Sequence, residues 1–481
     1  KDNKNLQVWD GELYLEMHRG TFTTKSDIKR ANRRLEEKFR TAEMLSVIRG
    51  EDNKEKITEL YKKFLINQFH DILPGSHIHP VFLDAMADYE EIENSLNEII
   101  GSGNKYFNTL NFKRDALTFI ENKKGSATRY GKKGNWIVPN IPALSSADLR
   151  KTSFTVEWFT VENNKVETPF YSVEFNNDGS IASLYDKELS REWVNGDFNK
   201  LKIYVDCPGN YDAWDILPNY REKEIAVNVV KPVTLVESDG ECATFSVSLG
   251  TEKSTWEMKI RFFRRGRGIE VENNVNWNEK HKLAKAEFQC NILTRKALCD
   301  TSAGFIERET HRNTTWQQAR FETCHHKWCD MSESGGGIAL INDGKYGVGF
   351  LDNSMSLSLL RATERPDVTS DIGEHSFCYM IVPHENDAVT AGINKLALQY
   401  NTPLVKGDYT WDLPTFEPLY LQAVKKSEDG KMTVIRLCEQ DGKRGKICLP
   451  HKVKLLNMLD VVVAVEKLVR VQRKNNKILV K

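Results

Sequence analysis

The residues best suited to chemistry are a histidine and an aspartate that stand side by side, His70 and Asp71. An amphipathic stretch precedes them and Pro74–Gly75 follows, so we expect the pair at the end of a helix, where a loop exposes both side chains to a cleft. An imidazole suits zinc, and a carboxylate accepts hydrogen bonds from sugar hydroxyls. A zinc site needs three or four ligands, so the pair taken alone is equally compatible with a structural role.

A second candidate combines aromatic rings with carboxylates in the segment Tyr211-Asp212-Ala213-Trp214-Asp215. Sugars stack on aromatic rings while carboxylates bind their hydroxyls, so Tyr211, Asp212 and Trp214 are predicted to line a cleft and bind substrate. The alternative is an ordinary turn in which a buried tryptophan packs beside aspartates.

Cys324, His325, His326 and Cys329 look like metal ligands at first sight. A site of this kind needs a second cluster elsewhere, and the sequence offers none with suitable spacing. Neighbouring residues of a strand also point to opposite faces. We therefore expect no structural zinc at this cluster.

The elements that position these residues change character near residue 100. Residues 7–18 alternate between apolar and polar side chains, with Glu12, Tyr14 and Glu16 on the polar side, which predicts a strand. Three amphipathic helices follow, starting at Ser26, near residue 55 and near residue 81, and together predict a small antiparallel bundle. The charged face of the first helix, which includes Lys29 and Arg33, is interpreted as solvated.

Beyond Gly101 short β-rich runs recur, separated by turns such as Asn177-Asp178-Gly179. Many short strands with such turns predict large antiparallel sandwiches. The expected fold class is therefore a multidomain α+β protein with a three-helix bundle followed by a large antiparallel β-sandwich region.

Composition limits the possible partners. Lys+Arg and Asp+Glu are both 68 in 481 residues, and this balance argues against nucleic acid or an anionic membrane as a partner. No apolar run approaches the ~20 residues that span a bilayer. Nine single cysteines favour a reducing, cytoplasmic location. A homo-oligomer is compatible with the sequence.

Several sequence blocks resemble one known family. QFHDILPGS, preceded by GELYLEMHRGTFTTKSDIKRANR, is similar to the end of the catalytic barrel and the helical middle region of glycoside hydrolase family 38 α-mannosidases. The resemblance continues in YDAWDI, EVENNVNWNEKHKLAKAEF, IALINDGKYGVGF and LSLLRATERPDVTSDIGEHSFCY, in family order. Phe69, where many animal members carry a second histidine, resembles the bacterial and cytosolic branch.

The resemblance implies domains and an activity. It assigns residues 1–25 to the end of an α/β barrel, 26–101 to the middle domain and 102–481 to the carboxy-terminal β-sandwich region. Family members retain configuration while they hydrolyse terminal non-reducing α-D-mannosyl residues, and a zinc ion contacts the mannose hydroxyls. The implied partners are therefore α-mannosides or mannose-containing oligosaccharides.

The resemblance also implies roles for particular residues. His70 matches the family's metal-binding histidine, and Asp71 matches the adjacent substrate-contacting aspartate. Retaining hydrolysis needs two carboxyl groups about 5–5.5 Å apart. Glu16 and Glu12 are therefore candidates for the catalytic acid and base, and the alternative is that both form the polar face of an edge strand.

The family's remaining zinc ligands and its nucleophilic aspartate have no counterpart in this sequence. We therefore expect a fragment, or one of two pieces, that shares its zinc ion with an amino-terminal catalytic half and is inactive alone. The alternative function is a non-catalytic carbohydrate-binding or scaffolding protein derived from such an enzyme.

Overall fold

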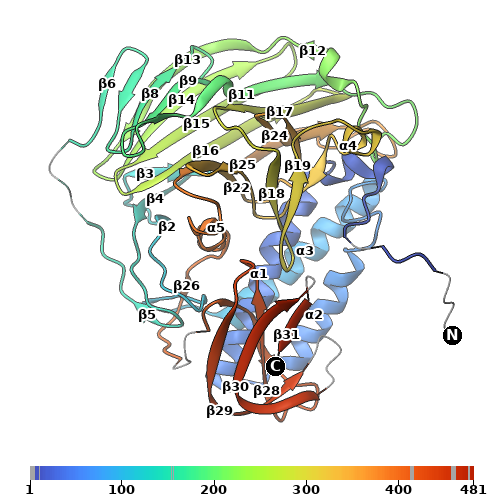
Figure 1. Ribbon diagram of the computed structural model, residues 1–481, viewed down its shortest axis with the longest axis vertical. Helices are drawn as coiled ribbons and strands as arrows, with labels where there is room; N and C mark the ends of the chain where they lie inside the picture. Colours follow the sequence, from blue (N-terminus) through green and yellow to red (C-terminus); the bar gives the residue numbers. More distant parts are fainter. Residues whose placement is uncertain are drawn as a thin grey trace.

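The computed structural model describes residues 6–9, 11–152, 154, 157–411, 416–456, 462–474 and 477–480. A bundle of three helices stands against a broad β region, and the carboxy-terminal strands lie beside the lower part of the bundle (Figure 1). The amino-terminal elements are a 3-10 helix and three α-helices: η1 (Glu16–Phe22), α1 (Ser26–Arg49), α2 (Lys54–Ile66) and α3 (His79–Ile100).

The predicted bundle is confirmed, because apolar side chains spaced three or four residues apart meet in one core. Its buried members include Leu35 and Phe39 of α1, Phe64 of α2 and Ile92 of α3. Gly50 ends α1 with a left-handed φ of 68°, a conformation that glycine adopts without a steric penalty.

The interpretation of the charged face of α1 as solvated is wrong for two of its residues. Lys29 and Arg33 are each only 5% exposed. Arg33 donates to His326 O at 2.9 Å and to Tyr346 Oη at 3.0 Å, from the β region. The helix is therefore covered on two sides, by the other helices and by the β region, and no local periodicity reveals the second side.

Two large antiparallel sheets form the centre of the β region. The nine-stranded sheet has the order β13 (Asn228–Ser238), β14 (Cys242–Gly250), β15 (Thr255–Phe263), β16 (Gly266–Trp277), β25 (Gly373–His384), β22 (Gly336–Asn342), β21 (Trp328–Glu333), β18 (Lys296–Thr301) and β19 (Gly304–Glu309). The six-stranded sheet has the order β12 (Glu224–Ile225), β11 (Val194–Val205), β17 (Lys282–Cys290), β24 (Ser354–Ala362), β23 (Gly347–Leu351) and β20 (Thr323–Cys324).

Smaller sheets surround this pair. A five-stranded sheet runs β10 (Arg191–Glu192), β9 (Ile181–Asp186), β8 (Tyr171–Phe175), β7 (Lys165–Glu167) and β6 (Thr160–Glu162). One three-stranded sheet has the order β26 (Val405–Lys406), β1 (Tyr106–Phe107) and β5 (Ser146–Ala147). A second has the order β2 (Thr118–Glu121), β4 (Lys132–Ile137) and β3 (Ala127–Arg129). A third has the order β29 (Gly445–Leu456), β30 (Val462–Lys474) and β31 (Lys477–Val480). The remaining elements are the pair β27 (Leu419–Lys426) and β28 (Thr433–Glu439), and the helices α4 (Thr315–Ala319), η2 (Tyr220–Glu222) and α5 (Ile393–Asn401).

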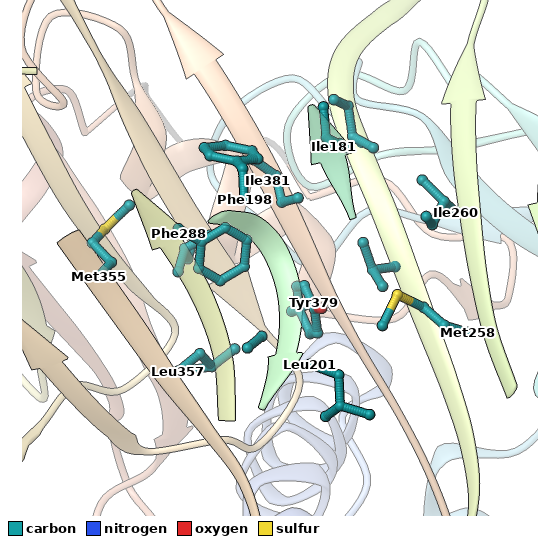
Figure 2. Close-up of a cluster of buried hydrophobic side chains, with 14 of the residues drawn as sticks. Ile181, Phe198, Leu201, Met258, Ile260, Phe288, Met355, Leu357, Tyr379 and Ile381 are labelled. Carbon is teal, nitrogen blue, oxygen red and sulfur yellow. The ribbon is translucent and has the colours of Figure 1, made fainter. Parts of the chain in front are cut away.

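The two large sheets share one hydrophobic core, part of which is drawn in Figure 2. Phe288 of the six-stranded sheet meets Tyr379 of the nine-stranded sheet edge to face, with ring centroids 6.1 Å apart. The Tyr379 hydroxyl donates to Asn199 Oδ1 at 2.6 Å, so this buried polar group has a partner across the core. The predicted antiparallel sandwich region is confirmed.

The strand predicted over residues 7–18 is wrong. Residues 6–9 and 11–15 form no strand, Asp10 lies outside the described residues, and η1 begins at Glu16. Alternation persists only locally, since Glu12 and Tyr14 are half-buried while Leu13 and Leu15 are 72% and 62% exposed. The Tyr14 hydroxyl donates to Glu322 O at 2.5 Å, so side chains rather than a β ladder hold this segment.

No helix in the described ranges is long and apolar enough to cross a bilayer. Eight cysteines are described, and each is a free thiol; Cys207 is the exposed one of these eight.

Candidate functional site

Residues 20–25, from the second half of η1 to the start of α1, are the point at which three loops meet. Gly20 N donates to Trp214 O at 2.8 Å, and Thr24 Oγ1 donates to Ala213 O at 3.1 Å. A Cβ atom on Gly20 would lie 2.6 Å from Arg361 Nη1, so only glycine allows this close approach. The segment therefore fixes the loop that carries Tyr211–Asp215.

A buried lysine holds the loop after α2 against the same segment. Lys29 Nζ donates to Thr24 O at 2.5 Å and to Leu73 O and Pro74 O at 3.0 Å. Gly75 has a φ of +90°, and a Cβ atom there would lie 2.5 Å from Thr24 O. The backbone of residues 67–75 is thus fixed to the beginning of α1.

This loop presents His70 and Asp71. Because α2 ends at Ile66, His70 lies in the turns that follow the helix, and its side chain is 77% exposed. His70 Nε2 lies 3.4 Å from Asp71 Oδ2, while Asp71 Oδ1 accepts a hydrogen bond from Ser76 Oγ at 2.8 Å. One carboxylate oxygen therefore orders the loop, and the other lies beside the imidazole.

Asp212 is turned inward. It is 5% exposed, and its Oδ2 accepts hydrogen bonds from Glu364 N at 2.7 Å, Arg365 N at 3.2 Å and His281 Nε2 at 3.1 Å. These bonds join the loop of Asp212 to the loop that follows β24. In this structure the carboxylate positions two loops.

The aromatic residues of the same loop are more accessible. Tyr211 is 57% exposed and has a left-handed φ of 57°, whereas Trp214 is half-buried. Their rings are perpendicular, with centroids 6.4 Å apart. The Tyr211 ring is therefore the part of this loop most accessible to another molecule.

Arg361 of β24 is the buried link between the loops. Its Nε donates to Asp206 Oδ2 at 2.6 Å, its Nη1 donates to Thr24 Oγ1 at 3.1 Å, and its Nη2 donates to Asp215 O. Arg361 and Asp206 are both almost fully buried, so each charge depends on the other. Arg361 lies in the sequence block LSLLRATERPD that resembles the family, and in the structure it links these loops.

Two aspartates of the following loop anchor the start of α1. Asp371 accepts hydrogen bonds from Lys25 N at 2.5 Å and Ser26 N at 2.9 Å. Lys25 Nζ lies 2.6 Å from Asp367 Oδ2. Burial alone raises the pKa of the Asp367 carboxyl, but hydrogen bonds from Lys25 and Thr369 outweigh it and hold the pKa at about 2.

The two glutamates near the amino terminus have different surroundings. Glu12 forms an ion pair with Arg308 of β19, in which Arg308 Nη2 lies 2.8 Å from Glu12 Oε1. Glu16 is exposed and makes no hydrogen bond or ion pair with any described residue. Glu12 and Glu16 are therefore not equivalent, because only Glu16 is available to another molecule without breaking an ion pair.

The cluster near Cys324 is part of the protein interior. Burial and the nearby Arg33 lower the pKa of His325 to about 3, so its ring is neutral at ordinary pH. His325 Nδ1 lies 3.1 Å from Tyr346 O, and its Nε2 lies 2.8 Å from Asn342 Nδ2. Both ring nitrogens are thus occupied by protein groups.

His70 and Asp71 fit a zinc ion only as part of a ligand set. Within the described ranges no group of three or more His, Cys, Asp or Glu side chains is placed to hold a metal ion. An exposed imidazole beside a carboxylate oxygen supplies at most two of the three or four ligands that zinc requires.

Sequence patterns did not reveal the residues that assemble these loops. Arg19, Lys25, Lys29 and Asp206 carried no recognisable signal, because their partners lie in distant parts of the chain. Arg19 Nη1, for example, pairs with Asp215 Oδ1 at 3.1 Å across 196 positions.

Two regions of the sequence match models of one family of glycosyl hydrolases. Residues 16–106 match the "Alpha mannosidase middle domain", and residues 166–369 match the "Glycosyl hydrolases family 38 C-terminal domain". The chain belongs to glycosyl hydrolase family 38, as the sequence blocks predicted. It contains the family's middle and carboxy-terminal regions.

Curated relatives carry the same family name. The chain is 30% identical to human "Alpha-mannosidase 2C1" over 443 residues, covering 84% of this chain and 41% of that protein. It is 29% identical to Dictyostelium discoideum "Alpha-mannosidase G", covering 91% of this chain and 48% of that protein. The chain thus spans less than half the length of these relatives.

A solved structure shows the same fold. An alpha-mannosidase from Enterococcus faecalis V583 superposes with a TM-score of 0.75 at 13% identity, covering 92% of this chain and 66% of that one.

Proposed function

We propose that this chain is the carboxy-terminal part of a retaining, zinc-dependent α-mannosidase that hydrolyses terminal non-reducing α-D-mannosyl residues. One observation carries the proposal: both loops are held at the beginning of α1. Thr24 bonds to the Tyr211–Trp214 loop, and Lys29 of α1 bonds both to Thr24 O and to the loop that follows His70 and Asp71. A metal-binding imidazole and a sugar-stacking ring are thereby held on one framework. Membership of family 38 supports the activity.

Each candidate residue has a proposed role. His70 is one zinc ligand, and Asp71 accepts hydrogen bonds from mannose hydroxyls through the oxygen beside the imidazole. Zinc, when bound, orients the mannose hydroxyls and stabilises charge in the transition state. Tyr211 and Trp214 contact the sugar ring. Asp212 holds their loop in place through Oδ2 and binds a sugar hydroxyl through Oδ1, which has no hydrogen-bond partner among the described residues.

Glu16 is the favoured candidate for the catalytic acid and base. Its carboxyl group is exposed and lacks a partner in the described part of the chain, whereas Glu12 already pairs with Arg308. A role for Glu12 would require it to exchange Arg308 for the substrate.

The chain is proposed to act together with an amino-terminal catalytic half that supplies the nucleophile and the other zinc ligands. Leu13, Leu15, Leu65, Ile66 and Phe69 are all more than half exposed. Exposed apolar side chains in the two segments that carry Glu16 and His70 are typical of a surface that another polypeptide covers. The amino-terminal segment leaves the body of the protein beside the bundle, where such a partner has access (Figure 1).

We further propose the division into residues 1–25, 26–101 and 102–481, and a cytoplasmic location that keeps the described thiols reduced. Fractionation of cells that express a tagged protein tests the location. Recovery of the protein in a secretory or vacuolar fraction would contradict it.

Reconstitution tests the function. The chain is co-expressed with the amino-terminal half of a family 38 enzyme, loaded with zinc and assayed on an aryl α-mannoside. We expect the pair to be active, each half alone to be inactive, and His70→Ala to lose activity and zinc together. His311→Ala removes an imidazole from another part of the surface and serves as the control.

Zinc content separates the possible failures. A His70→Ala pair that keeps its zinc and its activity would refute the metal assignment. A complex that binds mannosides but hydrolyses none, even with full zinc, would instead indicate a carbohydrate-binding or scaffolding protein.

A further inference from the structure

A cavity of about 880 Å³ opens between the small sheet β2–β4–β3, the end of α5 and strand β26. These elements lie on the side of the β region near β5 (Figure 1). None of the lining residues belongs to the three loops of the candidate site. The volume is in the range of about 300–1,000 Å³ that small-molecule sites usually have.

The lining of this cavity is basic, although the whole chain carries equal numbers of basic and acidic residues. Its charged residues are Arg114, Lys123, Arg129, Lys132, Lys133, Lys406 and a single acid, Glu121. Lys132 pairs with Glu121 at 2.8 Å. Lys123 and Lys133 are exposed and have no carboxylate partner in the described part of the chain, so their charges are available to an anion.

A buried arginine, Arg114, adds positive charge beneath the lining of the cavity. Arg114 is 1% exposed and donates to the carbonyl groups of Thr402 and Gln399, at 2.5 and 2.7 Å. Burial lowers its pKa to about 10, which leaves it protonated at neutral pH. No carboxylate bonds to its guanidinium group, and its Nε has no acceptor among the described residues.

Aromatic rings form the rest of the wall. Phe119, Trp136, Tyr106 and Tyr400 line the cavity, and Trp136 is 3% exposed with Nε1 unpaired in the described structure. The ring centroids of Phe119 and Trp136 lie 5.4 Å apart, with an angle of 64° between the ring planes. Rings of this kind pack against sugars and bases, whereas an inorganic anion gains nothing from them.

We propose that this cavity binds a phosphate ester carried on a ring, either a sugar phosphate or a nucleotide. The phosphate group lies between the ammonium groups of Lys123 and Lys133, and the ring packs against the half-buried side chain of Phe119. Lysine is a common phosphate-binding residue, and the unpaired N–H groups behind the lining favour an acceptor over a cation. This proposal does not depend on the mannosidase activity.

Calorimetry on the full chain tests the proposal with five probes: glucose 6-phosphate, AMP, glucose, adenosine and inorganic phosphate. We expect saturable binding of one of the two esters, weaker binding at higher salt, and little heat from the other three. Which ester binds identifies the ring.

Variants locate the site. Lys123→Ala combined with Lys133→Ala should weaken binding roughly tenfold for each charge removed. The control, Lys124→Ala with Lys431→Ala, removes two exposed lysines outside the lining. No saturable binding of either ester, equal affinity for inorganic phosphate, or equal effects of the two double variants would each overturn the proposal.

Discussion

Asp371 stabilises a helix that begins 345 positions earlier in the chain. The residue before α1, Lys25, has a left-handed φ of 57° and makes no side-chain capping bond. Asp371 caps the amino terminus of α1 instead, because its two carboxylate oxygens accept hydrogen bonds from the backbone amides of Lys25 and Ser26. Replacing Asp371 with alanine should therefore loosen the first turn of α1.

The magnitude follows from the two amides. Both lie in a buried region, and a buried N–H without an acceptor costs about 1–3 kcal/mol. Asp371→Ala should therefore destabilise the start of α1 by about 2–6 kcal/mol, toward the lower end if water enters. Asp371→Asn keeps one carbonyl acceptor but loses the negative charge at the helix amino terminus, so about 1–3 kcal/mol is expected.

Hydrogen exchange read by mass spectrometry is the appropriate assay, because it reports local opening at the start of α1 separately from the rest of the chain. We expect faster exchange over residues 25–35 and, through Lys29, over residues 67–75. Asp387→Ala is the control, since Asp387 accepts from Val389 N and Thr390 N at 3.0 Å but in an exposed turn. If Asp371→Ala exchanged no faster than the control, the remote cap would be refuted.

Three further outcomes are expected. The pKa of Asp367 is lowered to about 2 in the folded protein, so its carboxylate contributes roughly 2 kcal/mol to the free energy of unfolding above pH about 4. This contribution is lost as the pH falls toward 2. In acid unfolding, the stability difference between wild type and Asp367→Asn should therefore shrink between pH about 4 and 2. Arg361→Met leaves Asp206 buried without its partner and should cost about 3–5 kcal/mol, seen as a large drop in melting temperature that a conservative Leu360→Met lacks. Leu13→Glu with Leu15→Glu should change the stability of the isolated chain by less than about 0.5 kcal/mol, since both side chains are exposed, yet abolish co-purification with the amino-terminal half; unchanged co-purification would place the partner elsewhere.

The sequence predicts what depends on neighbours along the chain. Leu35 and Phe39 of α1 repeat at helical spacing, so the bundle could be predicted from local periodicity alone. Residues 12–15 alternate as a strand does, but alternation specifies a strand only where another strand pairs with it. In this chain no strand pairs with residues 12–15 in the described ranges; instead Glu12 pairs with Arg308, and Tyr14 bonds to the backbone of Glu322.

The arrangement of the candidate site depends on contacts that no local pattern encodes. Lys29 looks like one more charge on a helix surface, yet it fixes the loop of residues 67–75. Asp212 is a candidate sugar ligand by its residue type, and only the structure shows that its Oδ2 also accepts from backbone groups 152 and 153 positions away. Composition gives the residue types of a site, while the long-range contacts decide which of them face inward.

Burial divides the charged and polar groups around the candidate site into two kinds. Arg361, Asp206 and Lys25 are buried and satisfied within the chain, because an unpaired buried charge is too costly to keep. His70 and Glu16 are exposed, and the stability of the fold does not depend on their side chains. Substitutions at the first kind should therefore unfold the loops, whereas substitutions at the second should leave the chain folded and affect only what it binds. That difference makes His70→Ala a test of chemistry rather than of folding.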